Sequence, residues 1–338
     1  MKFNILKALA AASVAALALA ATPALAQNAF TIQVDGSSTV FPISEAIAEG
    51  FQGQTQGRVR ATVGESGTGG GFRKFCRGET HISNASRPIT TAEMTTCATA
   101  GIQYVEVPVA FDALTVVVHP SNPVRSATVA ELRRIWQPSA QGSVTNWRQV
   151  NPAWPDLALS LFGPGTASGT FDYFTEAVNG KSKASRTDYT PSEDDNVIVQ
   201  GVASNPGGMG YFGLAYYHEN ASRLRALAID NGSGPVEANV ANAANGSYAP
   251  LSRPIFIYIN TAALRRPQVM QFAQYYVQNA ATVASRVGYI PLPAAAYTTM
   301  GQRIQRRQAG TAFGGRQAIG ATIDEVLARR LVTMPVSN

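Results

Sequence analysis

Residues 31–42 read Thr31-Ile32-Gln33-Val34-Asp35-Gly36-Ser37-Ser38-Thr39-Val40-Phe41-Pro42. The apolar and β-branched residues at the start predict a strand over residues 31–34. Pro42 predicts the first turn of a helix over residues 41–51, because a helix start needs no N–H from it. A strand that passes through a polar Gly-Ser-Ser-Thr turn into a helix is typical of an α/β fold.

The same design occurs twice more along the chain. Ser66-Gly67-Thr68-Gly69-Gly70-Gly71 lies between an expected strand at 58–63 and a helix that begins near Gly71. Ala167-Ser168-Gly169-Thr170-Phe171 follows an expected strand at 157–162 and precedes a helix at 171–178. Short strands and helices alternate through the rest of the sequence, so we predict the α/β class. Further strands are expected at 81–84, 102–108, 113–118, 209–212, 225–229 and 255–259, and further helices after the capping boxes Thr90-Glu93 and Thr128-Glu131 and at 196–203, 267–278, 297–307 and 323–331.

The three loops share a chemistry that suits an anion. A helix N-terminus presents unsatisfied N–H groups and the positive end of its dipole, and glycine lets the backbone approach a ligand closely. Serine and threonine hydroxyls add further donors, so such a loop can hold an oxyanion. The alternative for a single loop is ordinary N-capping by serine or threonine. None of the loops has the spacing of a nucleotide P-loop or of a serine-hydrolase nucleophile elbow.

A fourth turn carries a cation. Asn84-Ala85-Ser86-Arg87-Pro88 follows the expected strand at 81–84, and Arg87 precedes the helix that Thr90 caps. A guanidinium can bind two oxygens of a tetrahedral anion with its planar fork. The alternative is an ordinary surface or interdomain ion pair.

The first residues indicate export. Lys2 and Lys7 precede an apolar run, and Ala24-Leu25-Ala26 is an A-x-A cleavage signal. We therefore expect residues 1–26 to be a signal peptide, no membrane span after it, and a periplasmic mature protein of two domains. Its 25 basic and 21 acidic residues give a net charge of +4, and the basic residues are spread out. This scattered pattern argues against a nucleic-acid partner.

Cysteine and histidine usage narrows the chemistry further. The chain has two cysteines, Cys76 and Cys97, and an isolated pair in an exported protein predicts one disulfide. Three scattered histidines give no metal-ligand spacing, so we predict no metal and no other cofactor. No nucleophile stands beside an evident base, and we predict that the protein is not an enzyme.

Taken together, the motifs resemble the periplasmic phosphate-binding proteins of bacterial phosphate ABC transporters. The resemblance covers nearly all of the mature chain. Its marks, in order, are Asp35–Pro42, Ser66–Phe72, Asn84–Pro88, Phe162–Gly165, Ser168–Phe174, Asp194–Val197 and Gly207–Phe212.

The resemblance implies a two-lobed periplasmic binding protein fold of type II, with the ligand cleft between the lobes. Lobe 1 would comprise residues 27–112 and 253–338, and lobe 2 residues 113–252. The protein would be a monomer that captures inorganic phosphate and passes it to the permease subunits of an ABC importer. The residues implied in phosphate binding are Ser38, Thr39, Val40, Ser66 with Thr68 as the competing alignment, Arg87, Ser168, Gly169, Thr170 and Asp172.

Two departures from the family leave open how the site would select one anion over another. Some members carry Asp where this chain has Arg87, and Arg where it has Pro164. The acceptor of a phosphate proton must then be another acid, and Asp172 and Asp112 are the candidates. Asp172 can instead stabilise the first turn of its helix through the helix dipole alone. Asp112 can instead hold the Arg87 side chain in place. Another oxyanion such as sulfate and, at a greater distance, a secreted phosphatase remain the alternative functions.

One segment is predicted to have no fixed structure. Residues 310–315 are rich in glycine and precede the last expected helix. This composition predicts a flexible linker.

Overall fold

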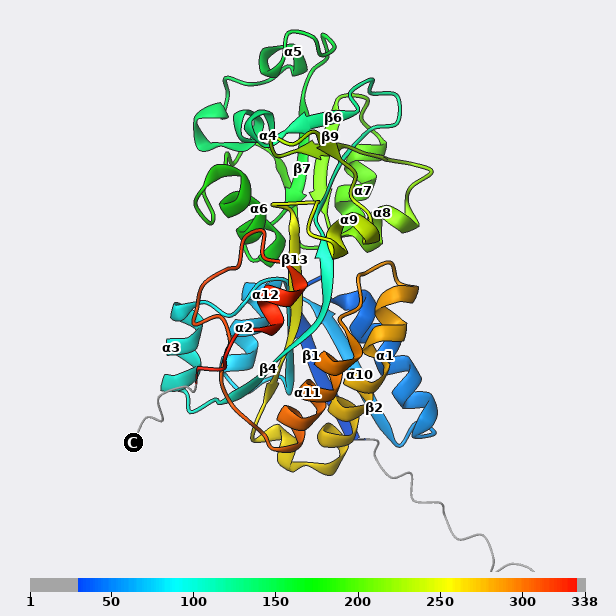
Figure 1. The fold of residues 1–338 in the computed structure, drawn as a ribbon, viewed down its shortest axis with the longest axis vertical. Helices are drawn as coiled ribbons and strands as arrows, with labels where there is room; N and C mark the ends of the chain where they lie inside the picture. The colour runs from blue at the N-terminus through cyan, green and yellow to red at the C-terminus, as the bar shows by residue number, and fades with distance from the viewer. Residues whose placement is uncertain (1–29, 333–338) are drawn as a thin grey trace, which may run out of the picture.

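The computed structural model describes residues 30–332. Figure 1 shows two lobes, one above the other, joined by the long strands β4 (Tyr104–Ala113) and β13 (Ser252–Asn260). These strands pair antiparallel from Tyr104 opposite Asn260 to Ala113 opposite Ser252. The predicted two-lobed α/β fold is confirmed. The expected signal peptide lies outside the described residues.

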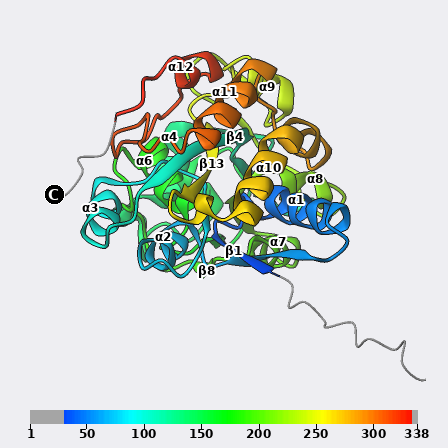
Figure 2. The ribbon, with the colours of Figure 1, turned by 90° about the horizontal axis from the view of Figure 1, so that it is seen from below.

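We call lobe 1 the part built on a five-stranded sheet of order β2-β1-β3-β13-β4. Strand β1 is parallel to β2 and β3, so the loops that follow these three strands leave the same edge of the sheet. Figure 2 shows α2 and α3 on the opposite side of β4 and β13 from α1 and α10. The other elements are β1 (Phe30–Gly36), α1 (Phe41–Gln54), β2 (Val59–Glu65), α2 (Thr68–Cys76), β3 (Ile82–Ala85), α3 (Thr91–Thr99), α10 (Pro267–Arg286) and α11 (Ala294–Gln305).

We call lobe 2 the part built on the second five-stranded sheet, of order β10-β5-β9-β7-β8. A small three-stranded sheet, β12-β11-β6, lies beside it. The elements are β5 (Thr115–Val118), β6 (Ser126–Thr128), α4 (Val129–Trp136), α5 (Trp147–Val150), β7 (Ser160–Pro164), α6 (Gly169–Asn179), β8 (Thr190–Ser192), α7 (Asp195–Ala203), β9 (Gly208–Phe212), α8 (Leu214–Glu219), β10 (Arg225–Ala226), β11 (Ala228–Asp230), β12 (Pro235–Val236) and α9 (Val240–Ala244). The residue limits that the sequence predicts for the two lobes stay a prediction.

Local sequence signals account for several element starts. Both predicted capping boxes are present: the Thr90 and Thr128 side chains accept from the Glu93 and Glu131 backbone N–H groups. The strand expected at 225–229 is instead two strands. Buried Leu227 interrupts it, because the chain leaves the main sheet after β10 and pairs with β6 through β11.

The predicted disulfide is confirmed: Cys76 and Cys97 are bonded. It joins the last residue of α2 to α3, and both cysteines are buried. The disulfide therefore ties the helix that carries the Ser66–Gly71 loop to the helix that follows the Arg87 turn.

The predicted linker at 310–315 is wrong. The Thr311 hydroxyl and the Ala312 N–H both donate to the buried carboxylate of Glu106 in β4, at 2.6 and 2.7 Å. Phe313 is buried and packs edge-on against Phe256 of β13. The glycine content suggested a flexible backbone, but hydrogen bonds to buried Glu106 of lobe 1 fix the backbone of this segment.

Candidate anion-binding site

The loops singled out in the sequence meet between the lobes. The hydroxyl oxygens of Thr39, from the β1–α1 loop, and Thr170, from the first turn of α6, lie 3.0 Å apart. The Gly69 N–H at the start of α2 donates to the Ala167 carbonyl of lobe 2 at 2.7 Å. Lobe 1 and lobe 2 are therefore in direct contact at this point.

Glycine allows this close approach. A methyl group added at Gly169 would lie 2.5 Å from the Thr68 hydroxyl oxygen and 2.6 Å from that of Ser86, which is too close for any side chain. Gly67, before α2, has a φ of +72°, which L-residues rarely adopt. The Ser168 hydroxyl caps α6 by accepting from the Thr170 N–H at 3.1 Å. Small residues and hydroxyls thus surround the N-termini of helices from both lobes.

The cation that touches these hydroxyls is Arg253, at the start of β13. One Nη donates to the Thr170 hydroxyl at 2.8 Å, and the other donates to the Gly169 carbonyl at 3.3 Å. Arg253 is fully buried, and its fork binds Asp112 Oδ2 at 3.0 and 3.3 Å. Burial raises the pKa of Asp112, and Arg253 offsets part of that rise. The positive charge is therefore held at the strands that connect the lobes.

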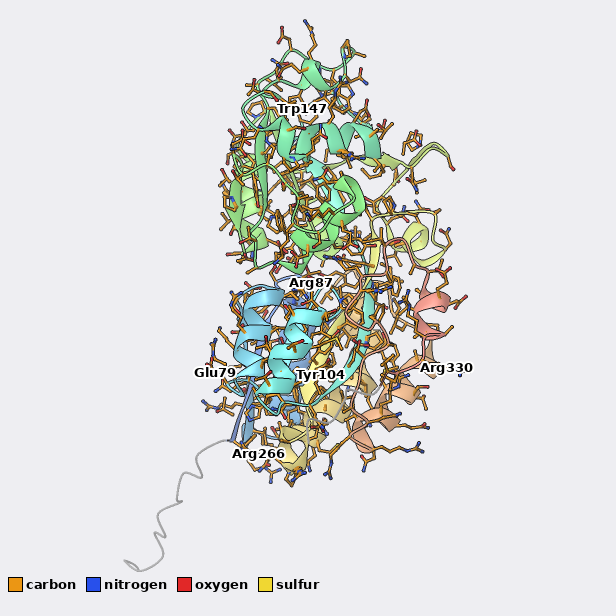
Figure 3. The ribbon with its side chains drawn as sticks, turned by 90° about the vertical axis from the view of Figure 1, so that its left-hand side faces the viewer. Glu79, Arg87, Tyr104, Trp147, Arg266 and Arg330 are labelled. Atoms are coloured by element: carbon orange, nitrogen blue, oxygen red, sulfur yellow. A yellow bond between two sulfur atoms is a disulfide. The ribbon has the colours of Figure 1, made fainter. Side chains whose placement is uncertain are left out.

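Arg87 also lies at the junction of the lobes, as Figure 3 shows. Its Nε donates to Asp172 Oδ2 in lobe 2 at 2.7 Å. Both Nη atoms donate to the Glu93 carboxylate at 2.8 Å, and one also donates to the Pro88 carbonyl. Four of the five guanidinium N–H groups therefore have protein acceptors. In this arrangement Arg87 links the lobes through a buried ion pair.

A third buried acid has a different environment. Asp195 begins α7 in lobe 2, is 1% exposed, and accepts from the Ser38 hydroxyl of lobe 1 at 3.3 Å. Burial and then nearby Glu65 raise its pKa well above the ordinary value. Within residues 30–332 no ion pair involves Asp195, whereas Asp112 and Asp172 each have an arginine.

Most of the predicted binding residues are brought together between the lobes. Two members of the predicted set face elsewhere. The Ser66 hydroxyl donates to the Asp35 carboxylate within lobe 1, and the Val40 N–H donates to the Ser37 carbonyl at 3.2 Å. Of the two alignments left open, the structure places Thr68 rather than Ser66 among the hydroxyls. The residues that lie between the lobes are Ser38, Thr39, Thr68, Arg87, Ser168, Gly169, Thr170 and Asp172.

The suggestion that Asp112 holds Arg87 is wrong: Asp112 holds Arg253, because both lie at the crossing of β4 and β13. Sequence reasoning missed Arg253, Asp195 and Ser86. A lone arginine at the head of the apolar strand at 255–259 was the available signal for Arg253. Ser86, inside the quoted Arg87 turn, hydrogen-bonds the Thr68 hydroxyl at 3.1 Å.

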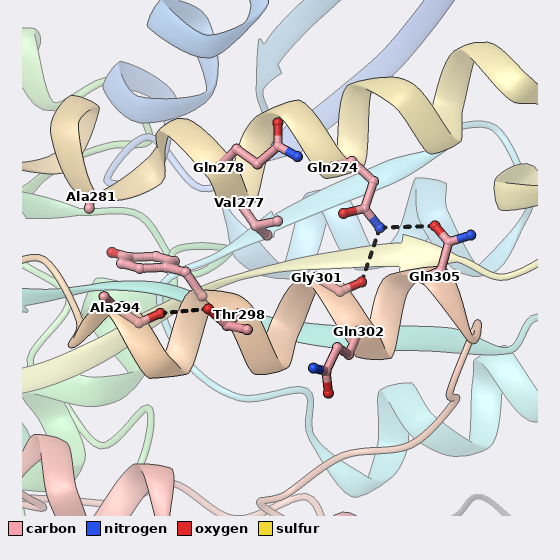
Figure 4. A pocket seen from close by; sticks show the side chains of 10 residues that line it. Gln274, Val277, Gln278, Ala281, Ala294, Thr298, Gly301, Gln302 and Gln305 are labelled. Carbon is pink, nitrogen blue, oxygen red and sulfur yellow. Dashed lines mark hydrogen bonds between the residues drawn. The ribbon is translucent and has the colours of Figure 1, made fainter.

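Two surface hollows lie away from this site. One is a groove of about 510 Å³ between α10 and α11. Figure 4 shows its lining side chains, among them Gln274, whose amide donates to the Gly301 carbonyl. A second hollow, of about 660 Å³, lies on lobe 2 beside Arg125 and Arg225. We call the three loops at residues 36–40, 66–71 and 167–171 the anion loops. Neither hollow is lined by a residue of the anion loops. Over residues 30–332, no cluster of His, Cys, Asp and Glu could hold a metal ion, and no helix could span a membrane.

Comparison with known proteins defines the class. A model of the PBP superfamily domain matches residues 21–280. Together with the two lobes and the loops between them, this match makes the chain a member of that superfamily of two-lobed binding proteins.

Relatives define the family more closely. Protein SphX of Synechococcus elongatus is 51% identical over 305 residues, which is 90% of each chain. The phosphate-binding protein PstS of Staphylococcus saprophyticus is 38% identical over 272 residues, 79% of this chain and 82% of the relative. The chain belongs to the family of SphX and PstS proteins.

Solved structures agree. A possible phosphate binding protein from Planctomyces limnophilus has a TM-score of 0.61 and 48% identity, covering 83% of this chain and 99% of its own. A substrate-binding protein from Clostridium perfringens, crystallised with bound phosphate, has a TM-score of 0.67 and 25% identity, covering 78% of this chain and 100% of its own.

Proposed function

We propose that this protein captures inorganic phosphate in the periplasm and delivers it to the permease subunits of an ABC importer. The observation that carries the proposal is the meeting of hydroxyls from both lobes with the buried guanidinium of Arg253. The names of the PstS relatives and the phosphate bound to the Clostridium perfringens protein support the same ligand. We propose a monomer that acts as a binding protein, with no catalytic step, cofactor or nucleic-acid partner.

In this proposal the anion binds between the two lobes and stabilises their closed arrangement. Thr39 and Thr68 donate from lobe 1, and Ser168 and Thr170 donate from lobe 2 together with the N–H groups at the start of α6. Arg253 supplies a positive charge whose position is fixed by Asp112. Preformed donors of this kind replace the water shell of the anion at little ordering cost.

In this proposal Arg87 acts mainly by joining the two lobes. Its pair with Asp172 joins the lobes beside the anion, so it favours the closed arrangement in which both sets of hydroxyls reach the ligand. Its remaining N–H group leaves room for one direct bond to phosphate. The direct contact stays a prediction, and the ion pair gives Arg87 a reason to affect affinity in either case.

Asp195 is the acid that we assign to phosphate selection. Phosphate near neutral pH carries a proton in part of its population, because such groups titrate near about pH 6. A carboxyl group without a cation can share that proton with the ligand. Sulfate brings no proton and meets only lone pairs and negative charge, so it is disfavoured.

The experiment is a calorimetric titration of the mature chain, unfolded and refolded to remove any bound anion. We expect one saturable phosphate site per chain and much weaker binding of sulfate. Equal or stronger sulfate binding would support the alternative oxyanion function. Release of product from a chromogenic phosphate ester would instead support the phosphatase alternative.

A further inference from the structure

We infer that the C-terminal arm, residues 310–332, is a positioning element of the binding site that holds α6 in place against lobe 1. This inference rests on the proposed function, because α6 carries Ser168 and Thr170 at its start. The arm includes the short helix α12 (Ile323–Leu327). The superfamily match ends at residue 280, so the arm lies outside the matched segment.

The arm is anchored in lobe 1 at both of its ends. The Gly310 N–H donates to the Tyr104 carbonyl of β4 at 3.1 Å, next to the bonds from Thr311 and Ala312 to Glu106. Thr311 and Val332 exchange two backbone hydrogen bonds, at 3.2 and 2.8 Å. The segment between these ends is therefore a closed loop whose base is fixed on the lobe 1 sheet.

Between its ends the arm crosses to lobe 2 and contacts one helix twice. The Gln317 side-chain amide donates to Glu176 Oε2 at 2.8 Å. The Gly320 N–H donates to the Tyr173 hydroxyl at 3.1 Å. Glu176 and Tyr173 both belong to α6. Figure 1 shows the arm, in red, rising from lobe 1 to the level of α6.

These contacts reach the anion loops through Tyr173. Its hydroxyl donates to the Ser252 carbonyl at the start of β13 at 2.7 Å, and the Arg253 guanidinium lies over its ring at 5.5 Å. Tyr173 is one helical turn beyond Thr170, whose hydroxyl accepts from Arg253. Because a helix moves as a rigid unit, a shift of Tyr173 or Glu176 also shifts the N–H groups at its start.

The arm therefore fixes the lobe 2 half of the site relative to Arg253. The Gln317 bond is well suited to a test, since it joins two side chains that lie away from the anion loops. Loss of one hydrogen bond to a carboxylate is expected to weaken phosphate binding about threefold to tenfold.

The variants are Gln317→Ala and Glu176→Ala, with Glu176→Gln as the conservative variant and exposed Gln308→Ala as the matched control. We expect both alanine variants at the bond to bind phosphate more weakly and to release it faster. Glu176→Gln keeps an oxygen acceptor for the Gln317 amide and is expected to retain most of the affinity. Gln308→Ala is expected to bind as the unsubstituted protein does.

Hydrogen–deuterium exchange without phosphate gives a second, independent readout. The amides of residues 169–172 are expected to exchange faster in Gln317→Ala than in Gln308→Ala, at equal melting temperature. Unchanged exchange at these amides would overturn the positioning role, and so would unchanged phosphate affinity and release in both alanine variants. An unsubstituted protein that binds no phosphate would overturn the proposed function, while the exchange measurement still decides the role of the arm.

Discussion

Replacing Asp195 with asparagine tests how the site separates phosphate from sulfate. The change keeps the shape of a side chain that is 1% exposed and lies 3.3 Å from the Ser38 hydroxyl. A hydrogen bond to a charged acceptor contributes about 1.5–3 kcal/mol, roughly twice a neutral one. We therefore expect Asp195→Asn to weaken phosphate binding about fivefold to tenfold at pH 8.

Sulfate should respond in the opposite direction. The ionised carboxylate repels sulfate, but the raised pKa of Asp195 lets the side chain take up a proton instead, which limits the cost to sulfate at pH 8. Replacing the acid should still strengthen sulfate binding, so the ratio of the two affinities should fall at least about tenfold. The assay is isothermal titration of the refolded protein with each anion at pH 8.

Asp172→Asn is the matched control, because Asp172 was the acid favoured from the sequence. Its Oδ2 accepts from Arg87 at 2.7 Å, so its loss should weaken both anions alike and leave their ratio unchanged. A full preference for phosphate in Asp195→Asn, together with a lost preference in Asp172→Asn, would refute the assignment and support the sequence-based one.

Three further outcomes are expected. Arg87→Ala should lower phosphate affinity at least about tenfold and the unfolding free energy by about 3 kcal/mol, because buried Asp172 then keeps only the exposed amine of Lys183, at 3.9 Å, as a cation. Unchanged affinity in titrations would show that Arg87 has no part in binding phosphate. The double variant Cys76→Ser/Cys97→Ser should lose about 3 kcal/mol of unfolding free energy in urea, and a loss near zero would contradict the loop-closure argument. Burial, then Asp194, raises the pKa of Glu65 from 4.5 to about 7. The folded state then binds more protons than the unfolded state, and unfolding free energy should fall as pH rises through this window. Glu65→Gln should flatten that fall in urea titrations, and an unaltered pH slope would contradict it.

The local signals in the sequence predicted the elements that surround the site. The strand, hydroxyl-rich turn and helix pattern at residues 31–51 is determined by neighbouring residues, and the structure has β1 and α1 there. The capping residues Thr90 and Thr128 act within three residues of their partners, so their helices could also be placed. The isolated cysteine pair left one intrachain pairing, which the structure contains.

Long-range partnerships could not be predicted in this way. Arg253 and Asp112 are 141 residues apart and meet because β4 and β13 pair, which no local pattern reveals. Glu106 fixes the segment at residue 311 across 205 residues, so glycine content alone gave the wrong expectation there. Asp195 was visible inside a motif, but its burial against Ser38 depends on contact between the lobes.

The most direct test of the central claim is to locate the anion itself. Arsenate has the shape and charge of phosphate and a strong anomalous X-ray signal, so crystals grown with arsenate would show where the ligand lies. We predict a single anomalous peak per chain between the lobes, within hydrogen-bonding distance of the Thr39 and Thr170 hydroxyls and the Arg253 guanidinium. A peak elsewhere on the chain, or none at saturating arsenate, would contradict the account.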